Sequence, residues 1–411
     1  MVTKFKYHLA EDTITKEDLR ALADWLTNNP TPQLTMGPLV KEYEQKWSKQ
    51  LGRKYSVSCN SGSSANLLMS YALLRSGLLR NRKVIVPSSA WVTSIAPFIQ
   101  LGFEPIMCEA DYDNWGLHLG YLKSLLDQHR PSTVMMVHVL GVPNKMEYIM
   151  NLKKQYGFFL LEDACAAIGS SYNSQKVGTF GDMASISTYY GHQTPTIEGG
   201  IVVTDNEELF NMLVMLRSHG WVAHLDSATR TKVLEQYEID DTGTHFVFCE
   251  PGFNFRFTDL QAFLGLRQID RLNWTIQKRF ENHKLYAKEL GKYFLIQVYN
   301  KSTVCSIHFC ALANDLNERK AIIKALEENG IETRPFTSGN QGMQPYWFRH
   351  YHKFSATMAN RLYNCGFFLP NHPYLKMIDI EYICSVVIKT ALDHRTTPPN
   401  NPIKENKKNA C

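Results

Sequence analysis

Short runs of apolar, β-prone residues alternate along the chain with segments of helical period. Four runs stand out, at residues 84–87 (VIVP), 133–139 (TVMMVHV), 158–161 (FFLL) and 201–204 (IVVT). This alternation predicts an α/β fold. Because the runs are apolar at nearly every position, we expect parallel strands covered by helices on both faces, and not an antiparallel sandwich.

The segments between these runs predict helices and a large first domain. Residues 63–79 and 122–130 show helical spacing of apolar positions, and the first of them opens with a Gly-Ser-Ser turn suited to a helix cap. A long helix begins near residue 260 and leads out of the sheet. We therefore predict a large domain, including the N-terminal segment, over residues 1–265.

A smaller α/β domain is predicted over residues 266–395. Within it, residues 303–312 and 331–336 have the composition of strands, and 317–330 form a helical pattern that ends at a glycine. The last stretch, 396–411, has too few apolar residues to pack and is expected to be disordered.

Composition narrows the class of protein. The 411 residues are 44% apolar and 20% charged, which suits a globular protein with a large core. The net charge of +5 comes without a long basic run, so we expect no nucleic-acid partner. Nine cysteines without a CxxC pair favour reduced thiols and a cytoplasmic location, and no apolar stretch approaches the length of a membrane span.

The segment SCNSGSSANLLMS places small residues after a predicted strand and at the start of a helix. Such a turn offers backbone N–H groups and a positive helix end to a phosphate. An ordinary helix cap explains the same residues. The patterns GxGxxG and GxxxxGK[ST] are both absent, so neither a dinucleotide site of Rossmann type nor a P-loop is supported.

Two carboxylates, Glu162 and Asp163, end the apolar run at 158–161, where open α/β sheets place their ligand sites. A carboxylate at that position can hold a cation. In a pyridoxal-phosphate site the cation is the protonated pyridine nitrogen, which makes the ring an electron sink. A helix-capping aspartate is the alternative.

Several motifs, taken together, resemble the DegT/DnrJ/EryC1/StrS sugar aminotransferase family. They are NSGSSA (60–65), EDA (162–164), the pattern S-x-x-x-x-H-x-x-x-x-x-EGG (187–200) and GFNFRFTDLQAFLG (252–265), with further similarity in TMGPLVKEYE (35–44) and VHVLGVPNKME (137–147). The resemblance covers residues 10–390. It implies the aspartate-aminotransferase fold (pyridoxal-phosphate-dependent transferase, fold type I), with a large, mostly parallel-sheet domain and a smaller C-terminal α/β domain.

His192 departs from the family pattern, which has a lysine in the loop before EGG. A histidine cannot form the Schiff base by which that lysine anchors the cofactor. Histidine at this position resembles the 3-dehydratase branch of the family, which implies non-covalent pyridoxamine or pyridoxal 5′-phosphate. It also implies a GDP-linked 4-keto-6-deoxymannose that loses its C3 hydroxyl, and L-glutamate as amino donor. Imidazole suits the proton transfers that this reaction needs.

The resemblance also assigns roles to individual residues. His192 and His219 are the expected catalytic histidines. Arg256 and Arg334 are candidate substrate-binding residues from their chemistry alone, because an arginine can hold a diphosphate or a glutamate carboxylate, or else an internal carboxylate. Asn254 matches an asparagine that reaches the cofactor phosphate of a neighbouring subunit, which implies a homodimer with shared active sites. The expected cofactor-binding residues are Gly62, Ser63, Ser64, Trp91, Asp163, Ser187 and Asn254.

Three further features bear on this interpretation. Ala166 stands where the family usually has a polar side chain near the ring hydroxyl of the cofactor. The electron distribution of the bound cofactor is therefore expected to differ from that in the rest of the family. Only Cys249 lies between Cys165 and Cys305, which argues against an iron-sulfur cluster. His350 and His352 form an HxH pair without a third ligand in view, so no metal site is predicted. An aminotransferase-like enzyme with altered chemistry and a catalytically silent cofactor-binding homologue remain as alternatives.

Overall fold

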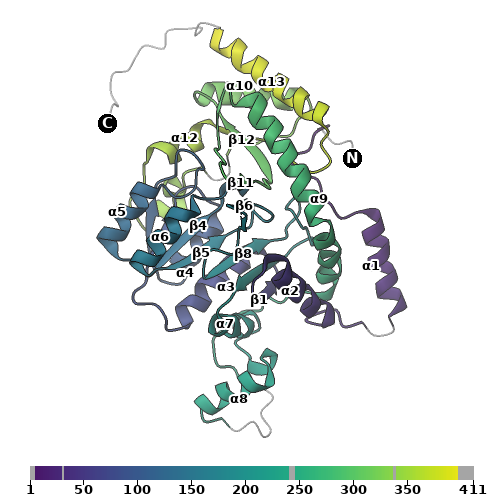
Figure 1. Ribbon diagram of the computed structural model, residues 1–411, viewed down its shortest axis with the longest axis vertical. Helices are drawn as coiled ribbons and strands as arrows, with labels where there is room; N and C mark the ends of the chain where they lie inside the picture. Colours follow the sequence, from purple (N-terminus) through teal and green to yellow (C-terminus); the bar gives the residue numbers. More distant parts are fainter. Residues whose placement is uncertain (1–4, 30–31, 240–245, 337–338, 397–411) are drawn as a thin grey trace.

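The computed structural model describes residues 5–29, 32–239, 246–336 and 339–396. A seven-stranded sheet forms the centre of its larger unit (Figure 1). The strand order is β1-β9-β8-β5-β4-β2-β3. The bounds are β1 (Tyr55–Cys59), β2 (Lys83–Pro87), β3 (Glu104–Cys108), β4 (Thr133–Val137), β5 (Phe159–Asp163), β8 (Met183–Ser187) and β9 (Gly200–Thr204). The predicted α/β fold with a large, mostly parallel sheet is confirmed.

The strand β9 is the exception to the parallel pattern. All neighbouring pairs from β8 to β3 are parallel, whereas β9 pairs antiparallel with both β8 and β1. The expectation that the run at 201–204 is a parallel strand is therefore wrong. The reason lies in its connection, because a loop joins β8 to β9 and a parallel pair needs a longer crossover, usually through a helix.

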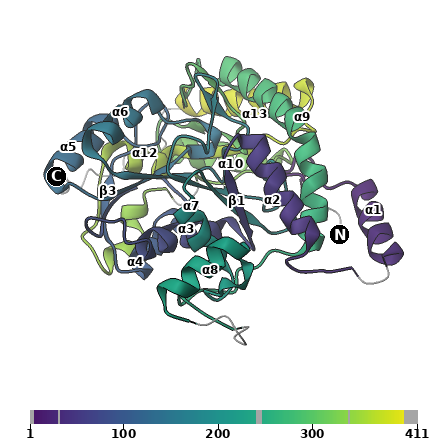
Figure 2. The ribbon, with the colours of Figure 1, turned by 60° about the horizontal axis from the view of Figure 1, so that its bottom comes forward.

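Alternate residues of each strand pack into different cores, so helices cover both faces of the sheet (Figure 2). Along β2, Val84 and Val86 pack with α3, α4 and α7, whereas Ile85 packs with α5 and α6 on the opposite face. A third cluster joins β8 and β9 to α2 and α9. These helices are α2 (Pro38–Leu51), α3 (Gly62–Arg75), α4 (Ala96–Gln100), α5 (Leu119–His129), α6 (Met146–Tyr156), α7 (Glu207–Arg217) and α9 (Asp259–Leu290).

The 32-residue helix α9 runs through both units. Ala262, Ile269 and Leu272 near its start pack in the core against β8 and β9, whereas Tyr286 and Leu290 near its end pack in the core of the smaller unit. The domain boundary predicted at residue 265 falls inside this helix. The helix is therefore a structural part of both units.

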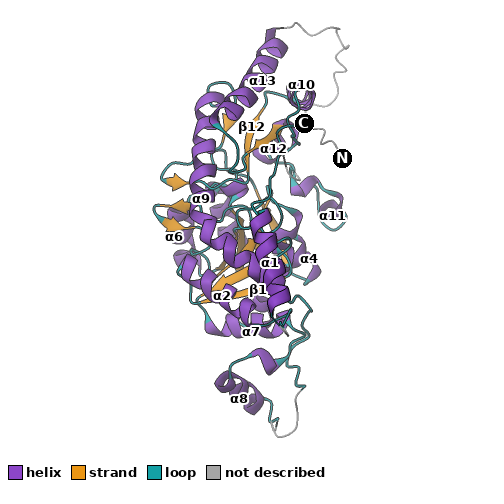
Figure 3. Cartoon of the chain, turned by 90° about the vertical axis from the view of Figure 1, so that its right-hand side faces the viewer, coloured by secondary structure: helices purple, strands orange, loops and turns teal. Residues whose placement is uncertain are grey.

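The smaller unit is a three-stranded antiparallel sheet packed against helices. Its strands are β10 (Leu295–Ile296), β12 (His308–Leu312) and β13 (Gly366–Pro370), and its helices are α10 (Leu316–Glu328), α11 (Pro345–Phe348), α12 (Thr357–Cys365) and α13 (Met377–Thr396). A further small sheet contains β11 (Ser302–Thr303), β6 (Ser171–Tyr172) and β7 (Gln175–Lys176). In Figure 3, α10, α12 and α13 lie at one end of the molecule and α8 (Ser227–Gln236) projects at the other.

Three local predictions differ from the structure. The helix predicted to reach residue 79 ends at Arg75, and Gly77 (φ 73°) follows in the left-handed conformation. Residues 331–336 follow the edge of β13 but form isolated bridges only, since Pro335 has no N–H to donate. The predicted disordered tail begins at Thr396, but this residue ends α13, and 397–411 lie outside the described residues.

No helix within the described ranges has both the length and the apolar character needed to span a lipid bilayer.

The N-terminal helix α1 (Lys16–Asn28) docks on α9 through Asp18, whose side chain is fully buried. The Asp18 carboxylate accepts hydrogen bonds from the guanidinium groups of Arg267 (2.6 Å) and Arg271 (2.7 Å) and from the backbone N–H of Thr15 (2.9 Å). Burial alone raises the pKa of Asp18, but the two arginines outweigh it and hold that pKa below its usual range.

We expect Asp18→Asn to lower the free energy of unfolding by about 2 kcal/mol at pH 7, because it leaves two guanidinium groups without their anion. The difference from wild type should shrink as pH falls below about 4, since the stability contributed by a carboxylate of lowered pKa is lost on protonation. Urea denaturation at several pH values measures both effects. Asp270→Asn is the control, because Asp270 is 68% exposed in its pair with Lys46. An equal loss in both variants would contradict the interpretation.

Candidate active site

A cavity of about 380 Å³ opens at the carboxyl edge of the central sheet. Val137, Asp163 and Ser187 are the last residues of β4, β5 and β8, which are neighbours in the sheet, and all three line the cavity. The start of α3 and the loops after β2 and β8 complete the wall. Open α/β sheets bind their ligands at this edge, so the cavity is the candidate active site.

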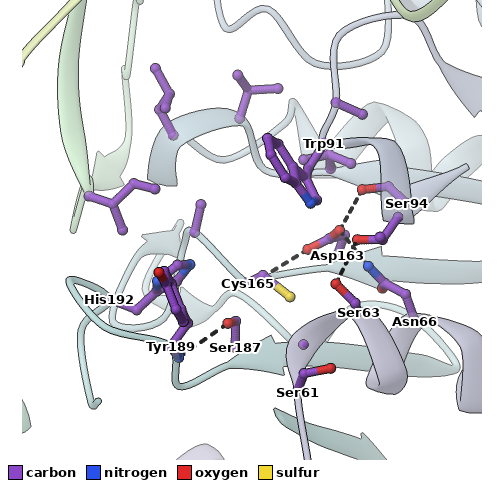
Figure 4. A pocket seen from close by; sticks show the side chains of 18 of the residues that line it. Ser61, Ser63, Asn66, Trp91, Ser94, Asp163, Cys165, Ser187, Tyr189 and His192 are labelled. Atoms are coloured by element: carbon purple, nitrogen blue, oxygen red, sulfur yellow. Dashed lines mark hydrogen bonds between the residues drawn. The ribbon is translucent and has the colours of Figure 1, made fainter. Parts of the chain in front are cut away.

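Asp163 is held in the floor of the cavity by three hydrogen bonds (Figure 4). Its Oδ2 accepts from Asn66 Nδ2 (2.9 Å) and from the Ser94 hydroxyl (2.6 Å), and its Oδ1 accepts from the backbone N–H of Cys165 (3.0 Å). The side chain is only 5% exposed. A carboxylate fixed in this way is oriented to hold a cation inside the cavity.

Glu162, the neighbour of Asp163 on β5, has a structural role. Its carboxylate lies 3.1 Å from His138 Nε2 and accepts hydrogen bonds from the backbone N–H groups of Gly178 (2.9 Å) and Phe180 (2.7 Å). Burial raises the pKa of Glu162, but these partners outweigh it and lower that pKa overall. Successive strand residues point to opposite faces, so only one of the two predicted carboxylates lines the cavity.

The first turn of α3 forms an anion cradle beside Asp163. Ser61 caps the helix by accepting a hydrogen bond from the N–H of Ser64 (3.0 Å). The N–H groups of Gly62 and Ser63 have no acceptor within the helix, as at every helix start. A Cβ atom on Gly62 would lie 2.6 Å from the Cβ of Ser187, so glycine is required for the close approach of α3 to β8. The cradle therefore combines N–H groups, the Ser63 and Ser187 hydroxyls and a positive helix end.

Trp91 lines the opposite wall of the cavity, as Figure 4 shows. It precedes the short helix η1 (Val92–Ser94), which carries the Ser94 hydroxyl to Asp163. The side chain is 53% exposed, which is unusual for a large aromatic residue. An aromatic surface of this kind is suited to stack on a planar ligand.

His192 reaches the cavity from the loop that joins β8 to β9. The base of this loop is closed by a hydrogen bond from the Thr188 N–H to the Gly199 carbonyl (2.9 Å) and by a contact between the Thr188 and Thr196 hydroxyls (2.6 Å). The imidazole Nδ1 is buried and has no hydrogen-bond partner among the described residues. Burial lowers the pKa of His192 to about 4, so the ring is unprotonated at neutral pH.

Arg334 brings a positive charge to the cavity from the smaller unit. Its Nη2 lies 3.4 Å from His308 Nε2, and its guanidinium group lies over the ring of Phe368 at 5.2 Å. Burial lowers the pKa of Arg334, and burial is also the main cause that lowers the pKa of His308 well below its usual range. Arg334 therefore offers a cation, beside a neutral histidine, to an anionic group of a ligand.

These residues fit pyridoxal or pyridoxamine 5′-phosphate. Asp163 matches the ring nitrogen, the cradle at Gly62 and Ser63 matches the phosphate, and Trp91 matches the ring face. His192 gives the site an unprotonated imidazole in place of an anchoring amine. Ala166 is the one departure, because it offers no polar side chain near the ring hydroxyl.

Seven of the predicted site residues line the cavity, and four do not. The seven are Gly62, Ser63, Trp91, Asp163, Ser187, His192 and Arg334. Ser64 lies next to the cavity in the capped first turn of α3, whereas His219, Asn254 and the half-buried Arg256 lie outside the cavity lining of this single chain. His219 and Asn254 are exposed, and a bridge between Ser218 and Asn254 places them on paired segments.

Other cavity residues were not expected from the sequence. Asn66 and Ser94 orient Asp163, and Tyr189 packs edge-on to His192 with ring centroids 6.0 Å apart. Asn66 lies four residues after Gly62 on the same helix face, and this spacing could have predicted that Asn66 also faces the cavity. Ala166 lines the cavity, as its position near the ring hydroxyl implied, and its carbonyl accepts a hydrogen bond from Gln193 (2.9 Å).

The described part of the chain holds no built metal site. No group of three or more histidine, cysteine, aspartate or glutamate side chains there is arranged to hold a metal ion. Eight of the cysteines fall within the described residues, and all eight are free thiols.

Comparisons with known proteins agree with this geometry. The GDP-4-keto-6-deoxy-D-mannose 3-dehydratase of Yersinia pseudotuberculosis is 32% identical over 340 residues, which cover 81% of this chain and 85% of the relative. A mutant GDP-4-keto-6-deoxymannose-3-dehydratase with bound GDP-perosamine superposes with a TM-score of 0.85 at 28% identity, covering 93% of this chain and 100% of that one. The same enzyme with a trapped PLP-glutamate geminal diamine gives a TM-score of 0.82 at 28% identity, with the same coverage.

The model of the DegT/DnrJ/EryC1/StrS aminotransferase family matches residues 12–388, which is most of the chain. Both the sequence motifs and the fold thus lead to one assignment. This protein belongs to the DegT/DnrJ/EryC1/StrS aminotransferase family.

Proposed function

We propose that this protein is a pyridoxamine-phosphate-dependent nucleotide-sugar 3-dehydratase that removes the C3 hydroxyl of GDP-4-keto-6-deoxymannose. The observation that carries the proposal is His192, an unprotonated imidazole that lines the cofactor cavity at the position where most of the family is expected to have a lysine. The relatives named GDP-4-keto-6-deoxymannose 3-dehydratase support the choice of sugar and nucleotide. The product is a 4-keto-3,6-dideoxy sugar.

The fixed residues of the cavity bind and orient the cofactor in this proposal. Asp163, held by Asn66 and Ser94, keeps the ring nitrogen protonated, and the first turn of α3 binds the phosphate. Trp91 covers one face of the ring and excludes water from it. When bound, pyridoxamine phosphate supplies an amine for the C4 ketone of the sugar and a ring that accepts electrons as the C3–O bond breaks.

His192 transfers the protons in this mechanism. Its unprotonated imidazole would accept a proton from the C4′ carbon of the bound cofactor and would return it to the C3 hydroxyl of the sugar as that group leaves as water. A lysine at this position binds the cofactor covalently and favours amino transfer, whereas the histidine leaves the cofactor free to be exchanged or re-aminated. L-glutamate is the amino donor, and a related enzyme trapped with a PLP-glutamate adduct supports this choice.

A homodimer with shared active sites accounts for the predicted residues that lie outside the cavity. Asn254 and His219 are exposed on paired segments, so one contact surface presents both to a second subunit. His219 has a positive φ of 64°, a conformation that costs free energy and persists where the surroundings impose it. In the dimer, Asn254 reaches the cofactor phosphate and His219 the substrate side of the neighbouring site, with Arg256 on the same surface.

Free thiols throughout the described residues are consistent with a cytoplasmic location.

The first prediction concerns the product. Purified protein with pyridoxal phosphate, L-glutamate and GDP-4-keto-6-deoxymannose should yield a sugar nucleotide lighter by one oxygen atom, together with ammonia and 2-oxoglutarate. Mass spectrometry of the sugar nucleotide measures this directly. An amino sugar would favour the aminotransferase-like alternative, and cofactor binding without turnover would favour the silent homologue.

The second prediction concerns His192. We expect His192→Asn to lower kcat at least about 100-fold, because general acid-base catalysis of this kind contributes that much or more. Cofactor affinity should stay near wild type, since Asp163 and the α3 cradle are unchanged, and absorbance titration with pyridoxal phosphate measures it. The control is His350→Asn, which removes an exposed histidine far along the chain. Full activity of His192→Asn would contradict the mechanism.

The third prediction concerns the shared sites. His192→Asn and Asn254→Ala should each be nearly inactive alone, but a refolded equal mixture should regain about a quarter of wild-type activity. Half of the dimers in the mixture are mixed dimers, and each has one site with both native residues. Two variants with their lesions on the same subunit surface, Asn254→Ala and Arg256→Ala, serve as the control pair. Absence of any recovery would place Asn254 in its own subunit's site.

A further inference from the structure

Arg279 is a charged side chain in the interior between the two units. It lies on α9, is fully buried and is among the largest fully buried side chains of the protein. No carboxylate forms an ion pair with it among the residues that the structure describes. A buried charge without a counter-ion costs free energy unless dipoles stabilise it, so its presence needs an explanation.

Backbone carbonyl groups surround the guanidinium group of Arg279. Nη2 donates to the carbonyl oxygens of Gly191 (3.0 Å) and His192 (3.5 Å), in the loop that carries the catalytic imidazole. Nη1 donates to the carbonyls of Ser306 (3.2 Å), Ile307 (3.0 Å) and Asn371 (2.9 Å), in the segments around β12 and β13. One rigid, planar group thus ties the histidine loop to the smaller unit.

The charge of Arg279 also acts on the imidazole. Burial is the main cause of the lowered pKa of His192, and the positive charge of Arg279 lowers it further, whereas Asp163 opposes both. Two other groups face the same region from the smaller unit. They are His308, which is unprotonated, and Arg334, whose charge lies beside His308. Tyr189 packs against the ring from its own loop.

We infer that Arg279 is a positioning residue for His192, which fixes the histidine loop through the carbonyl groups of Gly191 and His192 and adds a positive charge near the imidazole. This inference rests on the proposed function, in which His192 accepts a proton. A side chain that only filled the space would leave these five carbonyl oxygens without donors. Burial already keeps the imidazole unprotonated at neutral pH, and the charge of Arg279 lowers its pKa further.

The test compares Arg279→Gln, which keeps donors and loses the charge, with Arg279→Lys, which keeps the charge and loses the planar fork. The pH titration of His192 is followed by NMR of histidine labelled with ¹³C at Cε1, and the signal is assigned by its absence in His192→Asn. This readout needs no turnover, so it stands even if the proposed reaction fails. In Arg279→Gln the titration midpoint should move upward by about one pH unit, because removal of a nearby positive charge favours the imidazolium form.

Arg279→Lys should keep the wild-type titration of His192. Its kcat for dehydration should fall about 10-fold to 100-fold with little change in KM, because three ammonium protons cannot hold five carbonyls and the loop shifts. The acid limb of the kcat profile of Arg279→Gln should move to higher pH with the NMR midpoint. Together, the two variants separate the effect of the planar guanidinium group on the position of the histidine loop from the effect of its charge on the titration of His192.

Arg53→Gln is the matched control. Arg53 is also a buried arginine that donates to the backbone carbonyls of Gly181 (2.9 Å) and Asp182 (3.2 Å), and it differs from Arg279 in having a carboxylate partner, Asp205 (2.9 Å). It lies outside the lining of the cavity. It should lose stability like Arg279→Gln and leave the titration of His192 unchanged. A titration in Arg279→Gln that overlays wild type overturns the inference. If that variant does not fold, wild-type kcat in Arg279→Lys overturns it.

Discussion

Parallel pairing of β4, β5 and β8 is the constraint on which the active site depends. In a parallel ladder, neighbouring strands end at the same edge, so the chain leaves the sheet three times beside the same small volume. Asp163 and Ser187 are the last residues of their strands, so the sheet alone sets their positions and no loop conformation is needed. The remaining groups reach the same point from α3, η1 and the loop after β8, each of which begins close to this edge.

Close packing at two glycines sets how near α3 lies to β8 and β9, which the strand order alone does not determine. A Cβ atom on Gly200 would lie 2.1 Å from the carbonyl oxygen of Ser61, and one on Gly62 would overlap Ser187. Two glycines on separate elements therefore bring α3, β8 and β9 within contact distance, and the helix start is held against the carboxylate of Asp163 through Asn66. The result is a site whose anion cradle and cation acceptor are positioned before any ligand enters.

The sequence was sufficient to predict the parts that depend on local pattern. Apolar runs predicted β2, β4 and β5, and a carboxylate at the end of such a run predicted Asp163. It was not sufficient where distant segments meet. The direction of β9 depends on the connection before it, and Ser94 reaches Asp163 only because η1 packs over β5. Arg279 looks like any other arginine in a helical pattern, and only tertiary packing shows that it is buried among carbonyls.

The helix α9 has a mechanical consequence. At 1.5 Å per residue its 32 residues span about 48 Å, and each half is embedded in a different core. A hinge of the kind found in proteins whose domains are joined by a flexible linker is therefore absent along this helix. A change in the angle between the two units must bend the helix or slide it within one core, and both disrupt packed side chains. Arg334 of the smaller unit and Asp163 of the larger unit line the same cavity, so a bend in α9 that changes the angle between the units also changes the separation of these two charges.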